Sequence, residues 1–484
     1  MMNSDLYTRL KDYGGSDFYG FHMPGHKRQM LYPFENPMGI DITEIDGFDN
    51  LHHAEGILKE AQGRAAQLYG SSETHFLVNG STAGLLSAIS GCTARGGKII
   101  MARNCHKAVY HAAFLNELEV IYWMPGIDPV YGVNCGLPVD NLKKLLEENP
   151  ETQAVVMTSP TYDGVVSNVD KVVEIVHKCG IPLIVDEAHG AHFGFDRRFP
   201  GNSVGKGADV VIHSLHKTLP SMTQTALIHL NGVFADREKI RRYLAIYQTS
   251  SPSYVLMSSI DSCISLLAQK REELFDSFYH KLSAVRDQLG DMKKLHLYTK
   301  EDAMKRGGED LDPSKLLITT AGTNLNGKEL SSLLRERYHL EMEMEAPGYV
   351  LALTSIADTK EGFQRLVQAL MEIDRQCEEE RKYRCVEDVR NTSDEFPCVN
   401  ETAMSIWQAE RYRKKSVPLM ESSGHVSGEF VYKYPPGIPL IAPGEVISNE
   451  VLELVSLAKK QGINVQGMKD FTAESIEILE GIRP

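Results

Sequence analysis

The features that most constrain the fold and chemistry of this chain are two apolar segments. Each of them leads into an ionisable side chain. Residues 182–185 precede Asp186, and residues 210–213 are followed within four positions by Lys217. Pyridoxal phosphate requires such a pair, because a lysine amine must bond to its aldehyde and a buried carboxylate must keep its pyridine nitrogen protonated. The pattern favours this cofactor, with Lys217 as the Schiff-base residue and Asp186 on the ring nitrogen. The simpler alternatives are a solvated lysine and an acid satisfied by local N–H groups.

The composition indicates a globular protein with an ample core, since 42% of the 484 residues are hydrophobic and 24% are charged. This length predicts two or three domains. A formal net charge of −14 argues against nucleic acid or an anionic membrane surface as a partner, because phosphate groups select clustered basic residues. The charge is compatible with a small cationic substrate.

The cysteines and the first residues of the chain indicate a cytoplasmic protein. Eight cysteines are scattered without a CxxC pair or zinc-type spacing, so we expect reduced thiols and no metal. His189 and His192 lie in a glycine-containing loop, and we discount them as metal ligands as well. The chain does not open on a basic region followed by an apolar run, and no stretch approaches the roughly 20 apolar residues that span a bilayer.

Short apolar strands alternate with amphipathic helices over much of the first half of the chain. This alternation predicts an α/β fold with a mostly parallel sheet that helices cover on both faces. Loops at the carboxyl ends of such strands form the ligand crevice. The expected strands are 75–78, 98–102, 120–123, 154–157, 182–185, 210–213 and 226–230. A polar helix is expected at 264–290.

We expect four units along the chain. They are an N-terminal arm (1–50), a PLP-binding large domain (51–300), a small α+β domain (301–376) and a C-terminal unit (377–484). The small domain is expected to hold strands at 315–320 and 348–354 and a helix at 328–337. The last unit contains a proline-rich stretch, 434–445, and a helix that begins at Asn449.

Further residues at the expected strand ends suit the phosphate of the cofactor. The segment 79–84, Asn-Gly-Ser-Thr-Ala-Gly, follows a strand and opens a helix. Its N–H groups and the hydroxyls of Ser81 and Thr82 favour a phosphate, although the same residues also make an ordinary helix start. Ser214 and His216 of the lysine motif lie close enough along the chain to reach the same phosphate.

Two residues are candidates for contacts with the pyridine ring. His106 follows the strand expected at 98–102, where a flat imidazole can stack on the ring. A lone histidine is more often structural, and its place among the other motifs is what favours stacking. Ala188, two residues after Asp186, is a candidate for a small apolar contact on the opposite face.

Eight short motifs extend over nearly the whole chain. They are Phe-His-Met-Pro-Gly-His-Lys (21–27), Asp-Asn-Leu-His-His (49–53), Asn-Cys-His-Lys (104–107), Pro-Thr-Tyr-Asp-Gly (160–164), Asp-Glu-Ala-His-Gly-Ala-His (186–192), His-Ser-Leu-His-Lys-Thr-Leu (213–219), Gln-Thr-Ser-Ser-Pro-Ser-Tyr (248–254) and Tyr-Pro-Pro-Gly-Ile-Pro-Leu (434–440). Together they resemble the bacterial ornithine/lysine/arginine decarboxylase family. The length resembles its compact members, which lack a receiver-like leading domain.

The resemblance implies a PLP-dependent fold of the aspartate-aminotransferase type and a homo-oligomer, at least a dimer with shared active sites. The residues implied at the cofactor are Ser81, Thr82, His106, Asp186, Ser214, His216 and Lys217. Thr249 is expected to reach the phosphate of the neighbouring subunit's cofactor, and segment 21–27 to lie near the subunit boundary. Family members often have serine where this chain has Ala108, which puts in doubt a hydrogen bond from that position but not the stacking of His106.

The implied reaction is the decarboxylation of arginine, lysine or ornithine to CO₂ and an amine of the polyamine pathway. Glu445 is expected to pair with the cationic end of the substrate, although a solvated glutamate before a helix explains it almost as well. The sequence does not discriminate among the three substrates, because a methylene is worth only about 1–3 kcal/mol. An aminotransferase, a carbon–sulfur lyase of the same fold and a PLP-binding regulatory protein without turnover remain alternatives.

Overall fold

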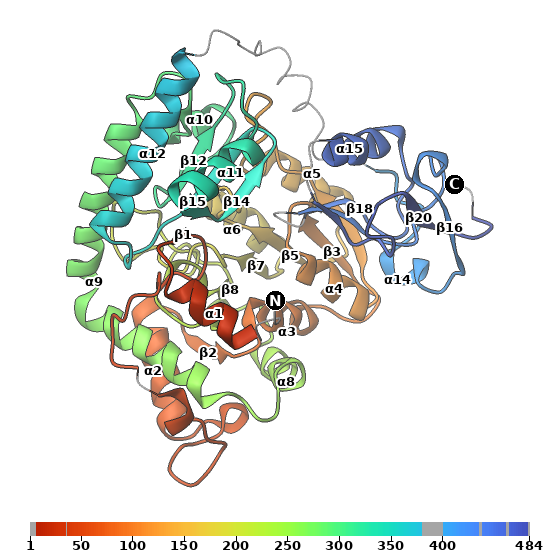
Figure 1. The fold of residues 1–484 in the computed structure, drawn as a ribbon. Coiled ribbons are helices and arrows are strands. Elements are labelled where there is room, and N and C mark those ends of the chain that lie inside the picture. The colour runs from red at the N-terminus through yellow and green to blue at the C-terminus, as the bar shows by residue number, and fades with distance from the viewer. Residues whose placement is uncertain (1–5, 35, 380–399, 435–437, 461–463, 483–484) are drawn as a thin grey trace.

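The computed structural model describes residues 6–34, 36–379, 400–434, 438–460 and 464–482 (Figure 1). A large α/β body lies at the centre, a smaller α/β body packs beside it, and the C-terminal residues form a third body on the far side of the large one. Within the described ranges, no helix has the length and apolar character needed to cross a membrane.

The central body is built on a seven-stranded sheet of order β2-β9-β8-β7-β5-β3-β4. Its strands are β2 (Glu73–Leu77), β3 (Lys98–Ala102), β4 (Glu119–Trp123), β5 (Thr152–Thr158), β7 (Leu183–Asp186), β8 (Val210–His213) and β9 (Ala226–Leu230). The five strands from β8 to β4 run parallel, while β9 is antiparallel to both of its neighbours. The prediction of a mostly parallel sheet is confirmed.

Helices cover both faces of this sheet because alternate strand residues point to opposite sides. Leu227 belongs to one apolar core, with α2 and α9, whereas its neighbour Ile228 belongs to a second core with α3 to α6. The helices are α2 (Ile57–Tyr69), α3 (Gly80–Cys92), α4 (Lys107–Leu115), α5 (Val139–Glu148), α6 (Val169–Lys178), α7 (Leu215–Thr218), α8 (Arg237–Tyr247) and α9 (Tyr254–Leu289). Helix α9 begins ten residues before the expected 264, where Ser253 caps it by accepting the Leu256 N–H.

The smaller body carries an antiparallel sheet of order β10-β12-β15-β14. Its strands and helices are β10 (His296–Leu297), α10 (Lys300–Lys305), β12 (Lys315–Thr319), α11 (Gly327–Tyr338), β14 (Met344–Ala346), β15 (Tyr349–Leu353) and α12 (Lys360–Glu379). The strands and helix expected at 315–320, 348–354 and 328–337 correspond to β12, β15 and α11. A short pair, β11 (Asp310–Leu311) with β6 (Val165–Val166), joins the smaller body to the large one.

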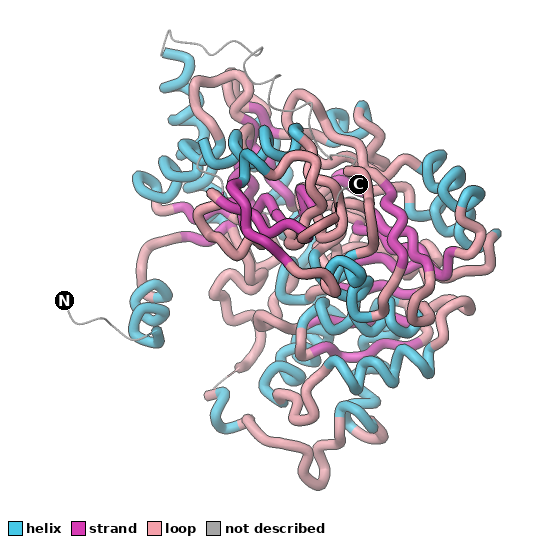
Figure 2. Tube along the Cα trace, turned by 90° about the vertical axis from the view of Figure 1, so that its right-hand side faces the viewer, coloured by secondary structure: helices cyan, strands magenta, loops and turns pink. Residues whose placement is uncertain are grey.

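The first residues connect the two bodies. Strand β1 (Tyr19–Phe21) pairs in parallel with β13 (Leu340–Met342) of the smaller body. Helix α1 (Leu6–Gly14) stands away from the rest of the chain, as Figure 2 shows, and none of its residues is buried. Two 3₁₀ turns, η1 (Pro37–Gly39) and η2 (Leu51–His53), lie between β1 and α2.

The C-terminal body contains two small antiparallel sheets, β16-β20 and β18-β17-β19, around its own apolar core. Its elements are α14 (Ile406–Ala409), β16 (Lys414–Pro418), η3 (Leu419–Glu421), β17 (Val431–Tyr434), β18 (Ile438–Ile441), α15 (Asn449–Lys460), β19 (Asn464–Gln466) and β20 (Ser475–Leu479). The helix expected from Asn449 is α15. Residues 435–437 of the proline-rich stretch, and most of the charged run after Cys377, lie outside the described residues.

Candidate active site

The fold brings Asp186 and Lys217 to the same edge of the central sheet. Asp186 ends β7, and Lys217 lies in α7, the single helical turn that follows the adjacent strand β8. Asp186 is 4% exposed and accepts the Ala188 N–H at 3.2 Å. Burial raises the pKa of Asp186, and the nearby Lys217 opposes that shift. A cation placed against this carboxylate therefore favours its ionised form.

The amine of Lys217 contacts the His189 ring. The same ring also contacts the amine of Lys315, which is buried. The Lys217 Nζ is 3.0 Å from His189 Nε2, and the Lys315 Nζ is 3.0 Å from His189 Nδ1. Lys315, the first residue of β12, is 1% exposed. Burial is the main cause that lowers the pKa of Lys217, and it lowers the pKa of Lys315 to about 8.

The residues expected around the phosphate gather at the start of α3. Asn79 precedes this helix without capping it, and its Oδ1 instead accepts the Thr249 N–H at 3.3 Å. The Ser214 hydroxyl donates to Ser81 Oγ at 3.0 Å, and Thr82 is exposed. The first N–H groups of α3 thus have no side-chain cap, which is the arrangement that binds phosphate at a helix amino terminus.

His216 has a defined orientation that limits what it can donate. Its Nδ1 lies 2.8 Å from the Thr225 carbonyl oxygen, so this nitrogen carries a proton. Burial lowers the pKa of His216 to about 4, which leaves Nε2 as an acceptor at neutral pH. His216 donates to a phosphate only if the anion raises its pKa.

His106 is held by its own helix start. It is the N-cap of α4, where its Nδ1 accepts the Ala108 N–H at 3.2 Å. His106 is exposed, and desolvation by the protein atoms around it, assisted by Lys217 and Lys107, lowers its pKa to about 3. The side chain is therefore a neutral, flat ring. Ala188 is buried beside Asp186.

The structure corrects the role expected for Glu445. Its carboxylate is 2% exposed and is held by the guanidinium of Arg103, with an Nη2–Oε2 distance of 2.9 Å. The Asn400 amide and the Ala442 N–H donate to the same carboxylate. Both oxygens are committed, so Glu445 joins the C-terminal body to the end of β3 and is not open to a substrate. The sequence did not reveal this pairing because Arg103 is 342 residues away.

Sequence reasoning missed three side chains that the fold brings to the cleft. Lys315 contacts His189, and the ring of Tyr162 lies 4.5 Å from the ring of His189. The Tyr162 hydroxyl donates to Glu343, which also accepts the Met23 N–H at 2.8 Å. The only signal for Lys315 was a lysine that opens an apolar strand.

Segment 21–27 packs on the lysine turn of the same chain. The Gly25 N–H donates to the His216 carbonyl at 2.7 Å. A Cβ at Gly25 would lie 2.7 Å from the Leu219 carbonyl oxygen, so only glycine allows this approach. The segment thus positions α7, whatever it contributes at a subunit boundary.

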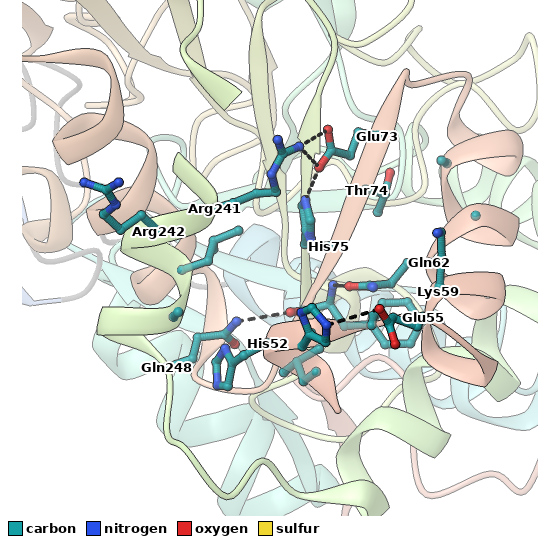
Figure 3. A pocket seen from close by; sticks show the side chains of 18 of the residues that line it. His52, Glu55, Lys59, Gln62, Glu73, Thr74, His75, Arg241, Arg242 and Gln248 are labelled. Atoms are coloured by element: carbon teal, nitrogen blue, oxygen red, sulfur yellow. Dashed lines mark hydrogen bonds and ion pairs between the residues drawn. The ribbon is translucent and has the colours of Figure 1, made fainter. Parts of the chain in front are cut away.

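A separate pocket of about 770 Å³ lies between α2, β2 and α8 (Figure 3). His52 and Gln248 line it, next to Thr249. Its side chains satisfy one another in part, since Arg241 and His75 both pair with Glu73. Lys217 and Asp186 do not line it, and we assign it no chemistry.

The residues present fit pyridoxal phosphate. A buried acid whose pKa burial raises, a half-buried lysine and an uncapped helix start with two hydroxyls lie at one edge of the central sheet, where the Ser214–Ser81 hydrogen bond joins the lysine turn to the helix start. These groups match the pyridine nitrogen, the aldehyde and the phosphate of that cofactor. The fit rests on the chemistry of the side chains.

Comparison with known proteins agrees with this chemistry. The family model "Orn/Lys/Arg decarboxylase, major domain" matches residues 4–361, and the model of the C-terminal domain of that family matches residues 392–469. The arginine decarboxylase of Bacillus subtilis is 31% identical over 98% of this chain and 97% of its own length. The arginine decarboxylase of Halalkalibacterium halodurans is 31% identical over 95% and 94%.

A solved structure shows the same fold. The lysine decarboxylase of Francisella novicida superposes with a TM-score of 0.79 at 19% identity and covers 98% of this chain and 80% of its own. From the family match over most of its length, the chain belongs to the Orn/Lys/Arg decarboxylase family and is a pyridoxal-phosphate-dependent decarboxylase of basic amino acids.

Proposed function

We propose that this protein decarboxylates arginine in preference to lysine and ornithine. The observation that carries the reaction is the placement of Lys217 and Asp186 at the ends of adjacent parallel strands. Arginine is favoured because two relatives that are 31% identical over nearly the whole chain are arginine decarboxylases.

The residues of the cleft have separate roles in this proposal. Lys217 would hold the cofactor through its aldehyde, and its amine would exchange there with the α-amine of the substrate. Asp186 holds the proton on the ring nitrogen, and its carboxylate is stabilised as an anion by that contact. His106 packs on one face of the ring as a neutral imidazole, and Ala188 lies on the other face.

The phosphate would bind at the start of α3. The proposed ligands are the N–H groups at the start of α3 and the side chains of Ser81, Thr82, Ser214 and His216, with Thr249 from a neighbouring subunit. Bound pyridoxal phosphate supplies an electron sink for the pair that remains when CO₂ leaves. The protein contributes orientation, a fixed proton at the ring nitrogen and an amine that exchanges with the substrate.

We also infer at least a homodimer with shared active sites. Large apolar side chains are exposed along the first 60 residues, which a monomer rarely leaves uncovered. They are Leu6, Tyr7, Leu10, Tyr13, Met30, Met38, Ile40, Ile45, Phe48 and Ile57. Thr249 is exposed and follows Gln248, a lining residue of the pocket between α2, β2 and α8, so a second subunit can approach it.

Two measurements test the reaction and its lysine. The purified holoenzyme is incubated with arginine, lysine and ornithine, and CO₂ and the amine products agmatine, cadaverine and putrescine are quantified. Borohydride reduction followed by peptide mapping then locates the cofactor. We expect mainly agmatine and a label on Lys217, with no label change in Lys107→Ala, which removes an exposed lysine of the same region. A label on another lysine would reject the assignment.

Mixed oligomers test the sharing of sites. Lys217→Ala and Thr249→Val subunits, each weakly active alone, are unfolded, mixed and refolded together. If Thr249 serves the partner's cofactor, mixed dimers contain one intact site and recover up to about a quarter of the wild-type activity of the sample. No recovery, with dimers confirmed by sedimentation, would contradict the shared site.

A further inference from the structure

The contacts of His189 restrict the protonation of both lysines that touch it. A lysine ammonium can donate a hydrogen bond but cannot accept one. A neutral imidazole offers one N–H and one lone pair, and an imidazolium offers two N–H groups. Because Lys217 and Lys315 each lie 3.0 Å from a different nitrogen of His189, at least one of the two amines must accept with a lone pair. That amine is unprotonated in either state of the ring.

The surrounding charges decide which amine this is. The groups that face the three residues from neighbouring elements are Asp163, Asp186, Asp312, Glu343, His106 and His216. Three carboxylates favour the ammonium of Lys315, namely Asp312, Glu343 and Asp163. Lys217 has only two such carboxylates, Asp186 and Glu343. The positive charge therefore belongs on Lys315.

We propose that Lys315 is a positioning residue that acts on Lys217 through His189. The ammonium of Lys315 donates to His189 Nδ1, which places the imidazole proton on Nε2. This N–H donates to the lone pair of Lys217 and keeps that amine in the nucleophilic form before the cofactor arrives. The inference rests on the proposed role of Lys217 as the residue that bonds to the cofactor.

The nucleophilicity of Lys217 can be measured without the cofactor and without turnover. The cofactor-free protein is labelled briefly with fluorodinitrobenzene across pH 6 to 11, and the labelled fraction of the Lys217 peptide is quantified by mass spectrometry. In Lys315→Met we expect the midpoint of the Lys217 profile to rise by about one pH unit. The labelled fraction near neutral pH then falls roughly tenfold. Lys315→Gln, whose amide can still donate to Nδ1, should recover part of the shift.

Two further variants separate this device from general effects of a lost lysine. Lys281 on α9 is also partly buried, but its Nζ donates to the Asp358 carbonyl, so Lys281→Met should leave the Lys217 midpoint unchanged. In a His189→Asn background, Lys315→Met should have no additional effect, because the connecting ring is gone.

An unchanged midpoint in Lys315→Met overturns the proposal, and so does an equal shift in the presence and absence of His189. Circular dichroism of each variant identifies any that fails to fold, in which case the His189→Asn protein alone must show the raised midpoint. Borohydride mapping of the holoenzyme is a separate readout. A label away from Lys217 would reject the proposed function and leave the measured coupling of the two lysines intact.

Discussion

Two charged clusters of this protein differ in how their charges are compensated. In the seam pair, Arg103 and Glu445 are both 2% exposed, and each charge meets its opposite in a two-point contact. In the cleft cluster, Lys217, His189 and Lys315 place two amines on one imidazole. Among the described residues, neither amine forms an ion pair with a carboxylate.

Because of this difference, we expect the seam pair to contribute to the stability of the fold and the cleft cluster to set the protonation of its amines. A compensated pair resists change, because removal of one partner leaves a buried charge that costs several kcal/mol. Amines without an ion pair respond instead by lowered pKa values: burial is the main cause for both Lys217 and Lys315, and the charge of Lys217 adds to the shift of Lys315. Variants of the two clusters should therefore fail in different ways.

The largest effect is expected in the cleft, at Asp186. In its proposed role Asp186 holds the proton on the ring nitrogen, and Asp186→Asn removes that charge, so we expect a fall in kcat of roughly 10²–10³-fold or more. Cofactor binding, followed by absorbance, should be retained. Activity within a few-fold of wild type would mean that another group pairs with the ring.

The seam pair should lose stability. Glu445→Gln leaves Arg103 buried without a counter-charge, and we expect the free energy of unfolding to fall by about 3–5 kcal/mol. Substrate KM in the folded fraction should not change, because Glu445 is not open to the cleft. Urea unfolding and steady-state kinetics measure the two quantities.

A double variant provides the control for the seam pair. Replacing both partners with apolar residues, as in Arg103→Met with Glu445→Leu, should recover much of the lost stability, because no buried charge remains. A raised KM in Glu445→Gln with normal stability would return Glu445 to substrate recognition.

The cleft cluster predicts a smaller effect that depends on pH. The pKa of Lys315 is about 8 in the folded protein and 10.5 ordinarily, so between these values the unfolded chain binds more protons. The free energy of unfolding therefore rises with pH across this window, by at most about 3 kcal/mol, and this contribution is lost as pH falls to 8. Urea unfolding of cofactor-free wild type and Lys315→Met at pH 8 and pH 10 measures this contribution of Lys315 to the free energy of unfolding. Parallel pH dependences would contradict the shifted pKa.

The smallest effect is expected where both charges are solvated. Lys144 and Glu148 form a 3.7 Å pair one turn apart on α5, with side chains 74% and 56% exposed. Lys144→Ala should change the free energy of unfolding by no more than about 0.5 kcal/mol. A loss comparable to that of Glu445→Gln would show that burial does not explain the contrast between the clusters.

Much of the fold was predictable because its signals are local. Strands β3, β8 and β9 begin and end where the sequence places them, since each is a short apolar run next to a glycine-containing segment. Helix α9 was expected too late, because its first turns are buried and less polar than the rest, and the signal of its Ser253 cap was not recognised.

The candidate site divides in the same way. The sequence by itself determined that Asp186 and Lys217 lie at the same edge of the sheet. Parallel strands bring their carboxyl ends to one edge, and the residues that follow them meet there. Only the tertiary structure decided what surrounds them. His189 contacts Lys315, which is 126 positions away in the sequence, and Arg103 forms an ion pair with Glu445, which is 342 positions away. Such pairs depend on how separate bodies pack, and periodicity along one segment carries no record of the residue that another segment places against it.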